Sequence, residues 1–95
     1  MAQYRTQVRI IADVLRTARD MNTEGNGVGI TALLRRGNMS YTRMAKLLSE
    51  LVGSGLLTEL SGDKISKYMI SEKGIQFLAA YYSFEDFAQS FGLRL

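Results

Sequence analysis

The strongest constraint on the fold is a pair of short helical patterns separated by a break at Gly37-Asn38. Thr31 is a suitable cap for a first helix over residues 32–36, and Ser40 is a suitable cap for a second helix. Two helices that are joined by a turn of three or four residues containing Gly form a helix-turn-helix unit. The sequence therefore predicts such a unit in the middle of the chain.

The second helix of this unit, which should run to about Gly53, is amphipathic. Apolar residues recur along it at helical spacing, and we expect them to face the core: Tyr41, Met44, Ala45, Leu48, Leu51 and Val52. The opposite side carries polar and basic residues, namely Thr42, Arg43, Lys46 and Ser49. This helix therefore has one side for the core and one side for solvent or a partner.

A longer amphipathic helix is predicted ahead of this unit, over residues 3–21. Its apolar residues fall at spacings of three and four: Tyr4, Val8, Ile11, Leu15 and Ala18. Its opposite side carries opposite charges four positions apart, which suits exposed ion pairs of Arg9 with Asp13 and Arg16 with Asp20. The Gly-rich stretch 22–29 is expected to be a loop. It lacks the preceding strand and the following Lys-Ser/Thr of a phosphate-binding loop.

Two β-prone runs follow the helix-turn-helix unit, over residues 56–60 and 65–70. They flank the turn-forming sequence 61–64, and this arrangement predicts a two-stranded hairpin. Ser71 then caps a last helix, with Glu72 in its first turn, where the helix dipole favours an acid. The predicted order of elements is therefore helix, helix, helix, hairpin, helix.

The last helix carries an apolar repeat of seven residues. Its members follow one another at alternating spacings of four and three: Phe77, Tyr81, Phe84, Ala88, Phe91 and Leu95. Such a repeat is typical of a seam between two helices, and a second face remains to cover the core of the domain, with Ile75, Leu78 and Tyr82. We therefore expect a homodimer that forms through this seam. Ser83-Phe84-Glu85-Asp86 also resembles a fresh helix start, which leaves open whether the helix is continuous.

Charge is unevenly distributed along the chain. The net charge is +3, yet residues 25–49 carry four basic residues and no acid, although the chain has nine acids. Residues 1–24 carry four Arg and three acids, and each of the two segments after residue 49, 50–73 and 74–95, has one more acid than basic residues. An acid-free basic segment suits a polyanionic partner such as nucleic acid, because carboxylates that face phosphates repel them.

Composition excludes several classes of site. The chain has no Cys and no His, so disulfides, thiolate chemistry and the commonest general base and metal ligand are missing. The acids are scattered, and Glu85-Asp86 suits a helix start better than acid–base catalysis. We therefore expect no enzyme, no cofactor and no metal. The chain has no long apolar run and no signal-peptide pattern at its N-terminus, so we expect a cytoplasmic protein without a membrane span.

The predicted order of elements is that of a winged helix-turn-helix domain, a mainly α fold with a two-stranded wing. In such a domain the helix that begins at Ser40 enters the major groove of DNA with its N-terminal residues. Arg43 could hold a guanine with two hydrogen bonds, and Lys46 could bind a phosphate. The other candidate contacts are the helix end at Arg35 and Arg36, the hydroxyls of Ser40 and Thr42, and the wing residues Lys64 and Lys67.

The stretch from Thr31 to Gly74 resembles the small archaeal winged-helix DNA-binding proteins, a family that includes a ten-kilodalton chromatin-associated dimer. The residues that carry the resemblance are Thr31, Asn38-Met39-Ser40-Tyr41, Leu48, Leu51, Gly55-Leu56-Leu57 and YMISEKG from Tyr68 to Gly74. The family pattern has Asn-Leu-Ser-Tyr, Gly-Leu-Ile and Tyr-x-Leu-Thr-x-Lys-Gly at these places. The first helix is also similar, so the resemblance covers about three quarters of the chain.

This resemblance implies a protein that dimerises through its last helix as an antiparallel coiled coil. It also adds Tyr41 to the DNA-contacting residues, although we expect the ring of Tyr41 to lie partly in the core. The sequence departs from the family pattern in three ways: Gly37 stands where Ala is usual, the first loop is longer and Gly-rich, and the last helix is shorter and aromatic. The third departure favours a compact aromatic interface over a rod-like one.

These observations lead to one principal function and two alternatives. The principal one is a homodimeric archaeal transcription regulator or nucleoid-associated protein that binds double-stranded DNA. Its winged domain would span residues 1–74, and its dimer helix would span residues 75–95 of the same compact unit. The first alternative is a winged-helix adaptor that binds proteins and no DNA. The second is a ligand-sensing regulator with a pocket beside the aromatic residues Tyr81, Tyr82, Phe84 and Phe87.

Overall fold

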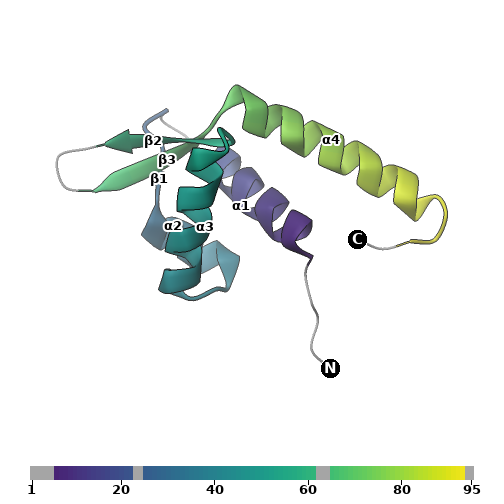
Figure 1. The fold of residues 1–95 in the computed structure, drawn as a ribbon, viewed down its shortest axis with the longest axis horizontal. Helices are drawn as coiled ribbons and strands as arrows, with labels where there is room; N and C mark the ends of the chain where they lie inside the picture. Colours follow the sequence, from purple (N-terminus) through teal and green to yellow (C-terminus); the bar gives the residue numbers. More distant parts are fainter. Residues whose placement is uncertain (1–5, 23–24, 62–64, 94–95) are drawn as a thin grey trace.

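The computed structural model describes residues 6–22, 25–61 and 65–93, and Figure 1 shows their arrangement. The elements in chain order are α1 (Gln7–Met21), β1 (Val28–Gly29), α2 (Ile30–Gly37), α3 (Tyr41–Gly53), β2 (Leu57–Ser61), β3 (Ser66–Ile70) and α4 (Glu72–Gln89). The predicted fold, mainly helical with a wing, is confirmed. The wing, made by β2 and β3, and the free end of α4 lie at opposite ends of the molecule (Figure 1).

The helix-turn-helix unit forms as predicted, with one difference at its start. α2 begins at Ile30 and is capped by Gly29, which makes no side-chain capping bond, so Thr31 lies inside the helix and the prediction of Thr31 as the cap is wrong. Asn38 ends α2 in the left-handed region, with φ 51° and ψ 48°. Asn tolerates this conformation because its short polar side chain can bond locally. Ser40 caps α3, as predicted.

The hairpin is confirmed, and a third strand joins it that the sequence did not predict. β1 pairs antiparallel with β3, with Val28 opposite Tyr68, so the strand order is β1-β3-β2. A strand of two residues is too short to show an alternating pattern, which is why residues 22–29 resemble a plain loop. Gly27 has φ +84°, and a Cβ there would lie 3.1 Å from the Cβ of Lys67. The chain therefore needs Gly where it enters the sheet.

The core lies where the helices meet the sheet. Its largest fully buried side chains come from each of α1, α2, α3 and α4: Leu15, Leu33, Met44, Leu48 and Leu78. Burying one such side chain contributes about 1.5–3 kcal/mol to the hydrophobic term of folding. Val8, predicted to face inward, is instead 50% exposed, since it lies in the first turn of α1 at the edge of the core.

Two residues of α3 depart from the predicted core side. Tyr41 is 62% exposed, so the expectation that its ring lies partly in the core is wrong. Tyr41 is the first residue of α3, and the buried side of the helix begins only one turn later, at Met44. Leu47, which the pattern left unassigned, is 6% exposed and belongs to the core.

α4 is one helix without a break at Ser83. At its start, the Ser71 Oγ accepts a hydrogen bond from the Gly74 N–H at 3.0 Å, and the Ser71 hydroxyl donates to the Gly55 carbonyl. Gly74 is itself buried, and a Cβ there would overlap the Leu56 carbonyl oxygen. The first turn of α4 is therefore fixed against the preceding chain, as the predicted Ser71 cap requires.

Candidate nucleic-acid interface

The exposed side of α3 carries the polar residues that the sequence predicts for it. Thr42, Arg43, Lys46 and Ser49 are all exposed. Their neighbours Met44 and Leu48 are fully buried, so the two sides of the helix are clearly separated. Because residues 25–49 contain no Asp or Glu, no carboxylate lies on this helix before its last turn.

Arg43 and Lys46 line a cleft between α1 and α3 of about 220 Å³. Gln7 of α1 and Glu50 of α3 line the same cleft. Arg43 therefore lies on the flank of α3 that faces α1, which helical spacing alone does not show. Thr42 and Lys46 lie nearer the centre of the exposed side, because they are farthest round the helix from the buried Met44 and Leu48.

Tyr41 lies on the opposite flank of α3, about 200° round the helix axis from Arg43. Burial raises the pKa of the Tyr68 phenol on β3, and the charges of Glu59 and of Tyr41 raise it further. Glu59 stands directly opposite Tyr68 in the register of β2 and β3. Tyr41 therefore lies on the flank of α3 that faces the wing, near two polar groups of the sheet.

The Ser40 hydroxyl caps α3 through its oxygen, so its proton can still be donated to a ligand. Its Oγ accepts a hydrogen bond from the Arg43 N–H at 3.2 Å, which satisfies one of the unpaired N–H groups at the start of α3. A hydroxyl can accept and donate at the same time. Ser40 can therefore cap α3 and still donate to a phosphate at the N-terminus of the helix.

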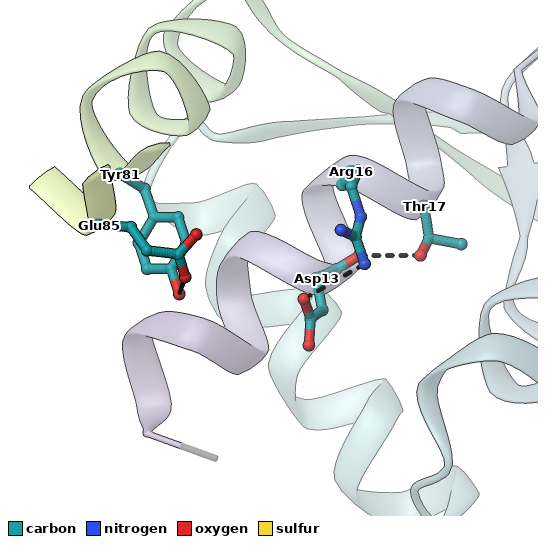
Figure 2. Close-up of polar contacts among 5 residues, drawn as sticks. All are labelled: Asp13, Arg16, Thr17, Tyr81 and Glu85. Carbon is teal, nitrogen blue, oxygen red and sulfur yellow. Dashed lines mark hydrogen bonds and ion pairs between the residues drawn. The ribbon is translucent and has the colours of Figure 1, made fainter. Parts of the chain in front are cut away.

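Arg35 and Arg36 are exposed in the last turn of α2, where the negative end of the helix dipole favours cations. Arg36 lines a second cleft, of about 310 Å³, between α1 and α2. On the α1 wall of this cleft, Asp13 pairs with Arg16 at 3.5 Å (Figure 2), in place of the predicted pair of Arg16 with Asp20. Both acids of α1 thus have an arginine partner on the same helix, Asp13 with Arg16 and Asp20 with Arg19, whereas α2 carries two arginines and no acid.

The wing carries Lys67 on β3, which is exposed as predicted. Lys64, the other wing residue predicted to contact DNA, lies outside the described residues. Ile65, which comes directly before β3, is 64% exposed. The alternation of the strand predicts this exposure, since it places Ile65 and Lys67 on the face opposite the core side of Tyr68.

α4 buries one set of its apolar residues and exposes another. Tyr81 and Ala88 of the predicted seam are only 7% and 3% exposed, because they pack within the chain, whereas Phe84 and Phe91 are 57% and 67% exposed. The apolar residues on the exposed side, which we call the aromatic stripe, are Phe77, Ala80, Phe84, Phe87 and Phe91. They keep the spacings of three and four that suit a helix–helix seam. Phe77 is half-buried.

The remaining predicted residue of the seam, Leu95, lies outside the described residues. Before it, Gly92 adopts φ +77°, and the Leu93 N–H donates to the Ala88 carbonyl at 3.0 Å, so the chain turns back at the end of α4. The rings of Phe87 and Phe91 meet edge to face with centroids 5.1 Å apart. The stripe thus continues past the end of α4 at Gln89 into the turn that follows it.

The junction of α1 and α4 has a polar and an apolar part. The Tyr81 hydroxyl donates to Glu85 Oε2 at 3.1 Å (Figure 2). Burial raises the pKa of Tyr81, and its hydrogen bond to Glu85 raises it further. Beside it, Val8 and Phe84 help to line an apolar cleft of about 200 Å³. Of the aromatic residues predicted beside an effector pocket, Tyr81 and Phe84 reach this small cleft.

Neither a metal centre nor a membrane span emerges from the described part of the chain. Its residues contain no group of three or more acidic side chains placed to hold a metal ion. None of its helices is both long enough and apolar enough to cross a bilayer.

The fold has a helix-turn-helix unit whose second helix is basic, and a β-hairpin wing follows it in the chain. These features together define the winged helix-turn-helix class. A family model described as winged helix-turn-helix matches residues 4–89. The chain therefore belongs to the winged helix-turn-helix family.

Among solved structures, the chain is similar to Sso10a-2, a DNA-binding protein from Sulfolobus solfataricus. The two have a TM-score of 0.75 and 24% sequence identity, over 92% of this chain and 85% of that chain. At this identity the likeness concerns the fold. No curated protein sequence matches the chain. The resemblance to small archaeal winged-helix proteins is thus confirmed at the level of family and fold.

Proposed function

We propose that this protein binds double-stranded DNA. The observation that carries the proposal is the exposed side of α3, where Arg43 and Lys46 are exposed and no acid precedes Glu50, beside the exposed Arg35 and Arg36 at the end of α2. These residues belong to the two helices of the helix-turn-helix unit, whose second helix reads DNA in this class of fold. The likeness of the fold to that of a protein described as DNA-binding supports the same proposal.

The arrangement of α3 suggests how the contacts are divided. A helix in the major groove has a phosphate backbone on either side of it. Thr42 and Lys46, at the centre of the exposed side, would face the floor of the groove. Tyr41 and Arg43 lie on opposite flanks, so we propose that they meet the two backbones. On this proposal Arg43 binds a phosphate, whereas the sequence favoured a guanine.

Outside α3, the proposed contacts lie on α2, at the N-cap of α3 and on the wing. Arg35, Arg36 and the Ser40 hydroxyl would hold the backbone near the N-terminus of α3. Lys67 and Lys64 of the wing would reach the neighbouring minor groove. All of these contacts except those on the groove floor are to phosphates, so affinity should depend strongly on salt and only weakly on sequence.

We further propose that two chains associate through the aromatic stripe of α4. Phe84 and Phe87 lie on one side of α4, Phe91 follows in the turn after it, and these three rings are 57–67% exposed. The helix itself extends away from the domain (Figure 1). Exposed apolar patches of this kind usually mark sites of protein–protein interaction. A dimer would present two α3 helices to DNA, as a nucleoid-associated protein or a small transcription regulator requires.

The experiment that tests DNA binding is fluorescence anisotropy of a mixed-sequence duplex across a salt series from about 50 to 200 mM. The Arg43→Ala/Lys46→Ala variant is compared with Lys73→Ala, whose basic side chain lies beside Gly55 at the far end of α3. We expect wild type and Lys73→Ala to bind alike, with affinity falling steeply as salt rises, and the double variant to lose binding at all but the lowest salt.

Absence of binding by the wild-type protein at about 50 mM salt would contradict the proposal. The aromatic stripe would then become the main functional surface, and the protein–protein adaptor would be the better account. Equal binding by the double variant and wild type would instead show that DNA contacts another surface. A target-selection experiment on the bound duplexes would next separate a regulator, with a large specificity ratio, from a nucleoid-associated protein.

A further inference from the structure

Ile65 is the most exposed of the large aliphatic residues in the described part of the chain, at 64%. It directly precedes β3, and the alternation of a strand places it on the same face of the wing as Lys67, away from the core side of Tyr68. The wing extends beyond the helices at the end of the molecule opposite the free end of α4 (Figure 1). Ile65 is therefore far from the aromatic stripe, and dimerisation through α4 would leave it uncovered.

Ile65 is attached directly to the paired part of the wing. β2 and β3 pair without interruption from Leu57 opposite Ile70 to Ser61 opposite Ser66, and Ile65 is the next residue. The ladder thus ends one position before the exposed side chain. An apolar side chain at the end of a paired hairpin can insert into a partner without being displaced, because the hydrogen-bonded backbone next to it is rigid.

The surroundings of Ile65 favour DNA over a protein as that partner. A protein-binding patch is normally a contiguous apolar area, whereas the residue that follows Ile65 on the same face is the exposed Lys67. Ile65 is an exposed apolar side chain next to a cation, while Leu60, opposite Lys67 on the same face, is half-buried. This matches the way that architectural proteins enter the minor groove, where Ile, Leu, Phe or Met wedges between base pairs and cations hold the phosphates.

We propose that Ile65 inserts between base pairs from the minor groove and bends the bound DNA. This inference rests on the proposed DNA binding. Lys67 would hold a phosphate next to the opened step, while α3 occupies the adjacent major groove. The wing would then determine the shape of the bound DNA, whereas α3 and the end of α2 would supply most of the affinity.

The test measures bending and binding on the same molecules. A duplex of about 18 base pairs, about 60 Å long, carries a fluorescent donor at one end and an acceptor at the other. Anisotropy establishes saturation, and energy transfer then reports the distance between the ends. We expect saturated wild-type protein to shorten that distance by a bend in the range of about 20–90° that apolar wedges produce.

Three variants separate the wedge from other effects. Ile65→Thr keeps a β-branched side chain, which suits the hairpin, but removes its apolar end, so its complex should give the energy transfer of free DNA. Ile65→Leu keeps an apolar wedge and should retain the bend. Ile75→Thr, at a 51% exposed Ile on α4, is the matched control and should behave as wild type. Melting temperatures check that all three variants fold.

Each outcome bears on the proposal. Loss of the bend in Ile65→Thr at saturation, with the bend kept in Ile65→Leu and Ile75→Thr, supports it. A saturated wild-type complex whose energy transfer equals that of free DNA would overturn the wedge and leave DNA binding intact. An equal bend in Ile65→Thr and wild type would also overturn it. Failure of the wild-type protein to bind the duplex at low salt would remove both the proposed function and this inference.

Discussion

α3 and α4 are both amphipathic helices, but they differ in what they leave exposed. α3 buries Met44, Leu47 and Leu48 and exposes polar and basic residues, so its two sides have different chemistry. α4 buries Leu78 and Tyr81, yet it also exposes a row of phenylalanines. The difference indicates two kinds of partner: a polyanion for α3 and an apolar surface for α4.

The largest effect is expected where α4 leaves the wing. A Cβ at Gly74 would overlap the Leu56 carbonyl oxygen and lie 2.6 Å from the Ile70 Cγ1. We expect Gly74→Ala to lower the free energy of unfolding by about 3 kcal/mol, because a packed backbone cannot make room. Chemical denaturation followed by circular dichroism measures it. Gly53→Ala, where a Cβ meets nothing within 4 Å, is the control, and equal stability of both variants would contradict the prediction.

The next effect tests the aromatic stripe with two adjacent alanines. Ala80 lies within the stripe, and Ala79 is also exposed but lies about 100° round the helix from it. We expect Ala80→Glu to raise the dimer Kd at least about 100-fold, because each copy would bury an unpaired carboxylate. Ala79→Glu should leave the Kd unchanged. Sedimentation equilibrium measures both, and a shared change, or no change in either, would exclude the stripe as the interface.

The two capping serines, Ser40 of α3 and Ser71 of α4, should differ in how much stability they contribute, and the more buried one should contribute more. Ser71 is half-buried and both accepts from Gly74 and donates to Gly55, whereas Ser40 is exposed and accepts from Arg43. We expect Ser71→Ala to cost about 1.5 kcal/mol of unfolding free energy and Ser40→Ala about 0.5–1 kcal/mol. Thermal denaturation compares them. Only Ser40→Ala should also weaken DNA binding, and a reversed order of stability would show that burial does not govern these caps.

Arg43→Ala distinguishes the flank of α3 from its centre. If Arg43 binds a phosphate, its removal should weaken binding by about 1 kcal/mol on every duplex sequence and reduce the salt slope by about 1. Anisotropy titrations on several unrelated duplexes provide both numbers. A loss confined to duplexes with guanine at one position would restore the base-reading role that the sequence favoured.

The smallest effect concerns the junction of α1 and α4 at high pH. The pKa of Tyr81 is raised in the folded chain, above the ordinary value of about 10 for Tyr. The stability that this shift supplies is present below about pH 10 and is lost as the pH rises through the folded pKa, because the unfolded chain gives up the proton first. Tyr81→Phe should therefore lose less stability than wild type above pH 10, as denaturation at several pH values would show. Parallel profiles would argue against a role for Tyr81.

Much of the fold follows from local signals in the sequence. The turn at Asn38 and the caps at Ser40 and Ser71 depend on interactions within a few residues, so the chain specifies them wherever it packs. The hairpin follows from two β-prone runs beside a turn. The acid-free segment is a property of composition, and composition together with helical spacing is enough to predict the basic exposed side of α3.

Other features depend on what packs against what. β1 has two residues and exists because β3 lies beside it. Whether Arg43 faces α1 or the wing depends on the position of α1 across the cleft. Neither fact is present in the local sequence, because each requires a partner that lies far away along the chain.

The seam of α4 shows this limit most clearly. Starting from Phe77, the residues Tyr81, Phe84, Ala88 and Phe91 satisfy the seven-residue repeat, and so do Ala80, Phe84, Phe87 and Phe91. The two sets differ by a rotation of less than half a turn, and both are apolar. Only the folded chain distinguishes them, because Tyr81 packs into the core and Ala88 is buried, whereas Phe84 and Phe87 remain exposed. The apolar spacing therefore predicts a row through Phe77, Phe84 and Phe91, but it does not show that Phe87 is exposed beside them while Tyr81 and Ala88 are buried, because burial depends on residues elsewhere in the chain.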